Sequence, residues 1–529
     1  MNLTTFRFFA FAILFIIVYF VVPKKVQWIV LLAASMAFYA LAGVKNSFFI
    51  LITSASTYAA ARWIDHLTVS CNSFLKENKN TLPREERKAY KARSVNQRKA
   101  ILIVTLCINF GILCVFKYAN FIIQQVNHIL RAAGSGEIGF LYLLVPLGIS
   151  FYTFTSMGYL LDVYWEKAPA QTNYLKMLLF VSFFPQITQG PISDYRQLSG
   201  QLYAEHPFDY KNFSWGVQRF LWGLVKKLVI ASISGKYSQA LFASYPEYSG
   251  ISTFIAILFY ALQIYADFSG YMDMMCGLCQ ILGIELAENF ERPYFSKSIS
   301  EYWRRWHITL GAWFKNYIYY PVGFSRFATS IGKKGQKALG DKFAKDMPAT
   351  IALIVVWFTT GLWHGANWGY IIWGLVNGMF VIATLWLEPV YARMRQFFHI
   401  RETSGGWRAF QVLRTFVLIS FIKILPEVGG LRAGLNLWAQ VVRGASIIPH
   451  TFAELLPFVD DYLNFAVILI FTVILFIFSL IERRKPVREA FNKWPMILRV
   501  FILALFFVIA ILFGARADGL NGAFLYAQF

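Results

Sequence analysis

The chain has 529 residues, of which 57% are hydrophobic and 18% aromatic, while only 15% are charged. This composition excludes an ordinary soluble domain and predicts a membrane protein with many apolar spans of about 20 residues each. Fifty basic against 28 acidic residues give a net charge of +22, but the basic residues lie between the apolar stretches, where membrane topology explains them better than nucleic-acid binding. We therefore expect membrane lipid around the chain and no nucleic acid as a partner.

The first apolar stretches predict three membrane spans, near residues 5–22, 27–43 and 47–64. A basic loop follows at 66–99, and the positive-inside rule places it in the cytoplasm, so the N-terminus is expected outside. A last span near 496–514 leads away from another basic loop, which puts the tail at 515–529 outside as well. The predicted location is the bacterial cytoplasmic (inner) membrane, with multiple passes and no cleavable export signal.

No internal repeat stands out, and we expect one integral membrane domain over residues 1–529. Its middle, between about 174 and 346, has short apolar runs that prolines and polar residues interrupt. In lipid, irregular backbone is tolerated only where protein buries it or it lines a watery cavity, so re-entrant and interfacial helices around a central cavity are predicted. No metal site is expected, because Cys276 and Cys279 have the C-x-x-C spacing without a second ligand pair.

A polar cluster interrupts the apolar stretch around residue 267. Asp267, Ser269 and Asp273 lie within it, and acidic side chains at membrane depth normally face the interior and have a partner. Two interpretations stay open. The carboxylates orient a histidine or bind a polar substrate group, or they pair with Arg304 or Arg305 as a structural lock.

The segment from 298 to 317 predicts a helix that lies along the membrane interface. Ser298 followed by Glu301 is a capping-box start, and an aromatic stripe follows at helical spacing, with the charged residues off the stripe. That stripe comprises Trp303, Trp306, Leu310, Trp313 and Tyr317. His307 lies at its edge, either as a functional group or as a histidine that is hydrogen-bonded among interfacial aromatics.

A second histidine, His364, lies at a predicted break between two apolar helices. Gly361 and Gly365 flank it, and such small residues allow other backbone or a substrate to approach the imidazole closely. Burial among Trp357, Trp363 and Trp368 favours the neutral imidazole, which suits general-base chemistry because its ordinary pKa is about 6.5. The alternative is a histidine in a helix turn that is bonded to a carbonyl group.

Several ordered motifs together resemble the membrane-bound O-acyltransferase (MBOAT) family, and within it the bacterial alginate O-acetyltransferase branch. They are FFPQ at 183–186, QGPI at 189–192, YADFSGYMD at 265–273, ENF at 288–290, RPY at 292–294, the stretch at 298–313 and GLWHG at 361–365. The likeness spans roughly residues 140–380, the expected catalytic core. The chain departs from the branch at Lys315-Asn316, where an Arg-Asp pair is usual, and at Gly323-Phe324, where two glycines are usual.

The resemblance implies an all-α fold, a ring of tilted transmembrane helices around a tunnel between the two membrane faces. It implies His364 as the catalytic residue and His307 as the second site residue. From the chemistry of thioesters we expect His364 to act as the general base and His307 to position or polarise the acyl carbonyl. The donor is expected to be acetyl-CoA, with no bound cofactor, and the acceptor an extracellular or cell-envelope polysaccharide. Candidate tunnel-lining residues are Trp303, Trp306, Trp363, Asn367, Asp267, Ser269, Asp273, Asn289, Arg304 and Arg305.

The aromatic end of the chain resembles that of polymer-acetylating members of the branch. Tyr526 is a candidate acyl carrier that presents the group to an SGNH-hydrolase-like acetyltransferase outside the membrane; the alternative is a tail that anchors at the interface. Two other functions remain open for the whole chain. One is D-alanyl transfer to teichoic acid from a carrier protein, and the other is a transporter or channel, which would predict internal repeats.

Overall fold

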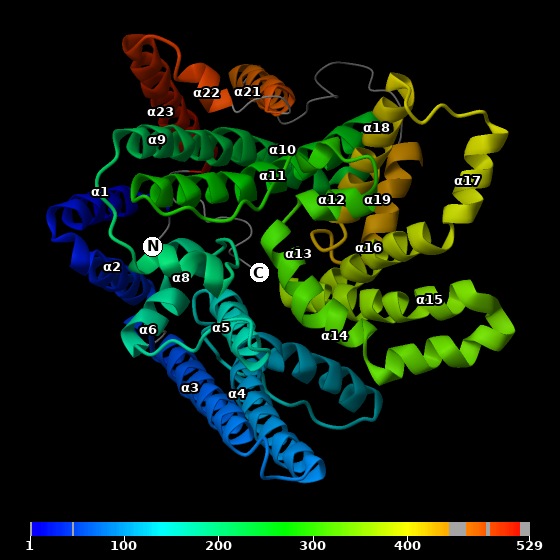
Figure 1. The fold of residues 1–529 in the computed structure, drawn as a ribbon. Helices are drawn as coiled ribbons and strands as arrows, with labels where there is room; N and C mark the ends of the chain where they lie inside the picture. The colour runs from blue at the N-terminus through cyan, green and yellow to red at the C-terminus, as the bar shows by residue number, and fades with distance from the viewer. Residues whose placement is uncertain (1–2, 45–46, 444–461, 483–486, 519–529) are drawn as a thin grey trace. The chain divides into compact units, whose positions relative to one another are not determined.

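The computed structural model describes residues 3–44, 47–443, 462–482 and 487–518, and most of these residues lie in helices (Figure 1). Their only pairing of strand type is an isolated antiparallel bridge between Phe290 and Trp306. Seven described helices are long and apolar enough to cross a membrane. The prediction of an all-α, multi-pass membrane protein is therefore confirmed.

The helices pack into two compact units. Unit 1 comprises residues 3–213 and 279–286. Its helices are α1 (Phe6–Val21), α2 (Gln27–Ala42), α3 (Ser47–Glu77), α4 (Arg84–Ala132), α5 (Ile149–Tyr164), α6 (Tyr174–Ser182), α7 (Phe184–Ile187) and α8 (Tyr195–Tyr203). The basic segment at 66–99, predicted as a loop, is helical except at the turn between α3 and α4.

Unit 2 comprises residues 214–278 and the described residues from 287 onward. Its first helices are α9 (Tyr210–Val225, which starts in unit 1), a π-helical segment (Lys226–Ala231), α10 (Ser232–Ala243), α11 (Gly250–Ile281), α12 (Ile299–Arg305), α13 (Ile308–Phe314) and α14 (Tyr320–Gly323). The later ones are α15 (Arg326–His364), α16 (Trp368–Trp386), α17 (Glu388–Phe397), α18 (Gly405–Lys423), α19 (Leu431–Arg443), α21 (Tyr462–Ile481), α22 (Val487–Phe491) and α23 (Met496–Asp518).

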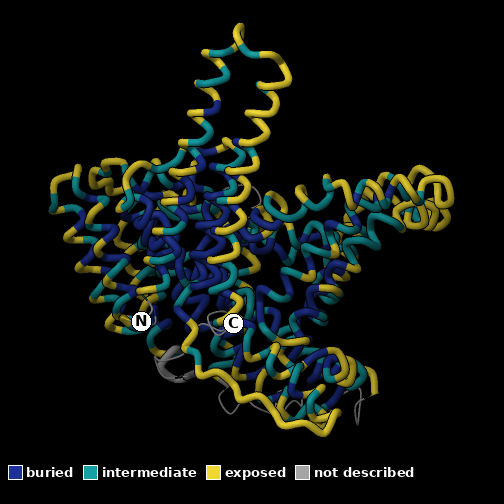
Figure 2. The backbone as a smooth tube through the Cα atoms, turned by 90° about the horizontal axis from the view of Figure 1, so that it is seen from below, coloured by how far each residue is buried: buried dark blue, intermediate teal, exposed yellow. Residues whose placement is uncertain are grey.

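Buried residues concentrate in the packed helices, whereas the hairpins that extend from them are largely exposed (Figure 2). The α3–α4 turn and the basic stretch of α15 around residues 333–342 are mostly exposed. By contrast, every residue of α11 between Ala266 and Met272 is buried. The polar cluster that the sequence places in this apolar stretch therefore lies in the interior of unit 2.

Glycines bring α9 and α11 into backbone contact. A Cβ atom at Gly223 would lie 2.5 Å from the carbonyl oxygen of Gly270, and one at Gly277 would lie 2.6 Å from the carbonyl oxygen of Gly216. Small residues at helix interfaces allow this close approach in membrane proteins. The contact sets the side chains that follow on α9 directly against the polar residues of α11.

Candidate active site

The predicted interfacial helix at 298–317 begins as expected and then breaks. Ser298 caps α12, its hydroxyl accepting a hydrogen bond from the backbone N–H of Glu301 at 3.1 Å. The helix ends at Arg305, and His307 has a left-handed backbone with φ of 50° before α13 starts at Ile308. The prediction of one continuous helix was wrong.

Hydrogen bonds from a distant loop explain the break. The carbonyl of Asn289 accepts the N–H of Ile308 at 3.1 Å, and its side-chain oxygen accepts the N–H and hydroxyl of Thr309 at 2.9 and 2.8 Å. Phe290 pairs with Trp306 in the isolated bridge. These bonds replace helical ones, so the loop at 288–292 fixes the backbone on both sides of His307.

The His307 side chain is almost completely buried, with 2% of its surface exposed. Its ring lies edge-on to Phe268, with ring centres 4.8 Å apart, and to Trp363, with centres 6.1 Å apart. Burial among these apolar rings lowers the pKa of His307 to about 3. The imidazole is therefore neutral at physiological pH and offers one N–H donor and one lone pair.

His364 is the last residue of α15, at the predicted break between two apolar helices. It is 7% exposed, and its ring lies edge-on to Trp363 and Trp373, with centres 4.9 and 5.0 Å away. Of the three tryptophans expected around it, Trp363 is a ring contact, whereas Trp368 is 54% exposed. The histidine thus faces α16 through Trp373.

Gly361, one helical turn before His364, allows other backbone to approach closely, as the sequence predicted. A Cβ atom at Gly361 would lie 2.5 Å from the carbonyl oxygen of Tyr370 on α16. The Tyr370 ring is nearly parallel to that of His364, at 6.2 Å between centres. The approaching backbone is therefore the first turn of α16, which holds aromatic side chains against the imidazole.

The two histidines share Trp363 as a ring neighbour although 57 positions separate them in the chain. Both belong to unit 2. A buried imidazole can act as a proton acceptor or as an N–H donor, and here two of them border one indole.

Two predicted lining residues have structural roles around this centre. The Trp303 indole N–H donates to the side-chain oxygen of Asn377 at 3.1 Å, and its ring contacts Trp357 and Trp373. Asn367 caps α16, accepting the N–H of Gly369 at 2.5 Å. Trp303 therefore connects α12 to α16, and Asn367 fixes the start of the helix behind His364.

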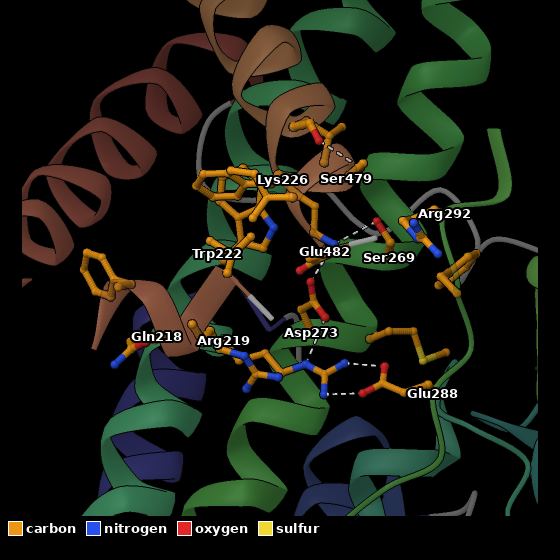
Figure 3. Close-up of a pocket in the computed structure, with 18 of the residues that line it drawn as sticks. Gln218, Arg219, Trp222, Lys226, Ser269, Asp273, Glu288, Arg292, Ser479 and Glu482 are labelled. Atoms are coloured by element: carbon orange, nitrogen blue, oxygen red, sulfur yellow. Dashed lines mark hydrogen bonds and ion pairs between the residues drawn. The ribbon is translucent and has the colours of Figure 1, made fainter. Parts of the chain in front are cut away.

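The polar cluster of α11 forms an ionic network with Arg219 of α9 and with the lysines of the π-helical segment that follows α9 (Figure 3). Asp273 binds Arg219 at 3.0 Å and Lys226 at 2.6 Å, and Arg219 also binds Glu288 through two bonds of 2.6 Å. Ser269 accepts a bond from Lys226 at 3.0 Å. Earlier on α11, Asp267 is 2.5 Å from Lys227.

These carboxylates do form ion pairs, as the structural-lock interpretation predicted, but with other cations than the two arginines that it proposed. Arg305 binds Glu301 within α12 at 2.7 Å, and Arg304 is exposed. The true partners of Asp267 and Asp273 are Arg219, Lys226 and Lys227. Sequence reasoning missed them, although the paired lysines stand inside an apolar run and signalled a buried partner.

Lys423 is a further buried residue that the sequence analysis did not single out. Its Nζ lies 3.3 Å from the ring centre of Trp306 and donates to the Tyr294 hydroxyl at 3.1 Å. Burial lowers the pKa of the Lys423 amine well below its usual value, so the hydrogen bond to Tyr294 and packing on the indole hold this side chain, rather than a full cation–π attraction. Lys423 therefore holds the residue that precedes His307, while Tyr526 of the predicted carrier tail lies outside the described residues.

Comparison with known protein families gives a match over the middle of the chain. Residues 166–334 match the model of MBOAT, the membrane-bound O-acyltransferase family. This segment contains the ionic network and His307 and ends before His364. The resemblance seen in the sequence motifs is confirmed.

Curated relatives cover a similar part of the chain. It is 37% identical to a probable alginate O-acetylase, AlgI, of Pseudomonas aeruginosa over 281 residues, 53% of this chain and 50% of that protein. It is 33% identical to a peptidoglycan O-acetyltransferase of Helicobacter pylori over 56% of this chain and 57% of the relative. A teichoic acid D-alanyltransferase of Bacillus subtilis is 28% identical over 44% of this chain and 57% of its own length. The chain thus spans about half the length of the curated relatives it matches.

Proposed function

We propose that this protein is a membrane-bound O-acyltransferase that moves an acyl group, acetyl in our proposal, from a cytoplasmic thioester to hydroxyl groups of an extracellular or cell-envelope polysaccharide. The observation that carries this proposal is the pair of buried histidines whose rings both contact Trp363. The similarity to an alginate O-acetylase and a peptidoglycan O-acetyltransferase supports the reaction class.

In the proposed reaction, His364 acts as the general base. Its imidazole accepts the proton of the acceptor hydroxyl while that oxygen attacks the thioester carbonyl carbon. An ester bond forms, the carbon–sulfur bond breaks, and the thiolate leaves with the proton that His364 held. A thioester already has a good leaving group, so activating and orienting the hydroxyl is the main task of the enzyme.

His307 has the complementary role of polarising the acyl carbonyl. Burial keeps its imidazole neutral, with a pKa of about 3, so the ring retains one N–H that donates to the carbonyl oxygen. As charge develops on that oxygen, the bond strengthens in surroundings without water. The left-handed backbone that Asn289 stabilises sets the direction of this donor.

Acetyl-CoA is the proposed donor, which reaches the histidines from the cytoplasm through a tunnel in the bacterial cytoplasmic membrane. Tyr526 is the proposed carrier: its phenolic oxygen is the acceptor of the first transfer, from the thioester. An SGNH-hydrolase-like partner outside then moves the acyl group to a polymer hydroxyl, which breaks the phenolic ester and restores the tyrosine. Tyr526→Phe removes only that oxygen, so polymer acylation should stop in this variant while membrane insertion persists. Full activity of Tyr526→Phe would exclude the carrier role.

The decisive experiment replaces His364 by Ala in the full-length protein. Acyl groups on envelope polysaccharide, measured by mass spectrometry, should fall about 10²- to 10⁴-fold, the usual contribution of a general base. His399→Ala is the matched control, because His399 is exposed in the turn that follows α17. Unchanged acylation in His364→Ala would favour a transporter or channel instead.

D-alanyl transfer from a carrier protein is the second candidate, which the similarity to a teichoic acid D-alanyltransferase favours. Both reactions open a thioester with a hydroxyl, and the two histidines serve either. Purified protein offered acetyl-CoA in one assay and a D-alanyl-loaded carrier in another separates them. Turnover of the carrier alone would replace acetyl by D-alanyl in the proposal.

A further inference from the structure

A cavity of about 640 Å³ lies within unit 2, and neither His307 nor His364 lines it. Residues of α9, α11, α21, α22 and α23 and of the loop at 288–292 form its walls (Figure 3). Its size falls within the range of about 300–1,000 Å³ that is typical of ligand pockets. The cavity has an apolar side and a charged side.

The apolar side comes mainly from two hydrophobic helices. Leu475 and Phe478 of α21 and Ile502, Leu503 and Phe506 of α23 line it. The apolar windows of these helices have mean hydropathies of 2.8 and 3.0, and only 11% and 6% of their residues are buried in the protein. Helices of this kind face hydrocarbon, so the cavity adjoins the lipid phase.

The charged side includes the ionic network, whose charges balance one another. Arg219 and Lys226 both bind Asp273, and Arg219 also binds Glu288. Their cationic charge is therefore offset by carboxylates at hydrogen-bond distance. A ligand that binds at this end therefore interacts with the charged groups that lie outside the ionic network.

Two guanidinium groups stand beside this network. Arg292 has a left-handed backbone with φ of 48°; its side chain is 21% exposed and pairs with that of Glu291 at 3.7 Å. Arg488 of α22 also lines the cavity, with its guanidinium carbon 5.6 Å from the Trp215 ring centre. The acids beside them lie toward solvent, because Glu291 is 63% exposed and Glu482 is exposed as well. The buried part of this end is therefore electropositive.

We propose that this cavity binds one phospholipid, whose phosphodiester lies against Arg292 and Arg488 and whose acyl chain lies along the wall of α21 and α23. Guanidinium groups match phosphate oxygens in geometry and charge, and basic pockets between membrane helices bind anionic headgroups. Inorganic phosphate shares the headgroup chemistry but uses none of the apolar wall. An amphiphile uses both sides of the cavity.

The test uses the full-length protein, delipidated in detergent, reconstituted into vesicles of phosphatidylethanolamine and phosphatidylglycerol, and extracted again mildly. Native mass spectrometry then counts retained phospholipid. The wild type should retain one molecule per chain. Leu503→Trp, which fills the apolar side, and Arg488→Gln, which removes a phosphate ligand, should each weaken retention about tenfold or more.

Matched variants serve as controls. Leu505→Trp places the same side chain on an exposed position of α23, and Arg393→Gln removes an exposed arginine of α17. Both should retain lipid like the wild type. Equal retention by all four variants would mean nonspecific surface lipid and would overturn the proposal.

A second arm distinguishes lipid from free phosphate. The melting temperature of the delipidated protein is measured with inorganic phosphate alone and with the same vesicles. Stabilisation by the vesicles that Leu503→Trp abolishes supports the lipid. Equal stabilisation by inorganic phosphate, insensitive to Leu503→Trp, would overturn it in favour of a phosphate site.

Discussion

His307 combines a left-handed backbone with nearly complete burial. Each feature opposes folding, because a non-glycine residue in this conformation is strained by about 1–3 kcal/mol and a buried imidazole loses its hydration. The hydrogen bonds of Asn289 and the surrounding aromatic rings offset these costs. Strain of this kind concentrates at functional positions, which agrees with the role proposed for His307.

The low pKa of His307 predicts acid-sensitive stability. Its folded pKa is about 3, against about 6.5 in an unfolded chain. Between these values the unfolded chain binds a proton that the folded protein does not. Lowering the pH from 6.5 toward 3 should therefore reduce the free energy of unfolding, by up to about 1.4 kcal/mol per pH unit; above pH 6.5 this contribution does not change.

His307→Gln should weaken this dependence of the free energy of unfolding on pH. Unfolding measurements in detergent at pH 5 and pH 7 can determine it. His399 provides a close control, because it also has φ of 50° but is exposed. His399→Gln should keep the wild-type slope. An unaltered slope in His307→Gln would mean that His307 is not the group that remains neutral.

At the scale of helices, the contact between α9 and α11 depends on the absence of side chains at its glycines. A Cβ atom at Gly223 would lie 2.5 Å from the Gly270 oxygen and 2.7 Å from the Met274 nitrogen. Both are backbone atoms, so the helices must separate to accept a larger residue. That separation would also pull Arg219 and Lys226 away from Asp273.

Gly223→Val should accordingly lower the free energy of unfolding by at least about 1–3 kcal/mol, the usual penalty of overpacking. Gly406→Val at the start of α18 is the control, because a Cβ atom there meets nothing within 4 Å. Reversible unfolding in mixed detergents measures both. Equal stability of the two variants would contradict the close packing of α9 on α11.

Local patterns predicted those features that depend on neighbouring residues. The Ser298 cap, the end of α15 at His364 and the start of α16 all follow from nearby capping residues and glycines. The break at Trp306 and His307 was missed because it depends on Asn289 and Phe290, which no helical period reveals. The partners of Asp267 and Asp273 were missed for the same reason, since they lie at least 40 positions earlier in the chain.

At the scale of the whole molecule, loop charge predicts its orientation in the membrane. The α3–α4 turn should be cytoplasmic and the C-terminal tail outside. In a variant without the five native cysteines, Lys79→Cys should react with a membrane-impermeant maleimide only after the cells are permeabilised, whereas Gln528→Cys should react in intact cells. The reverse pattern would invert the topology and with it the side from which the donor enters.

The loop at 288–292 contributes both to the wall of the cavity and to the support of the backbone around His307. Glu288 and Arg292 line the cavity, while Asn289 and Phe290 hold the backbone around His307. If the lipid and the acyl donor each favour one conformation of this loop, their binding is thermodynamically linked, and the factor by which one tightens the other is equal in both directions. Lipid composition would then act as an effector of acyl transfer, and a bound acyl donor would in turn slow the exchange of a single lipid with the bilayer.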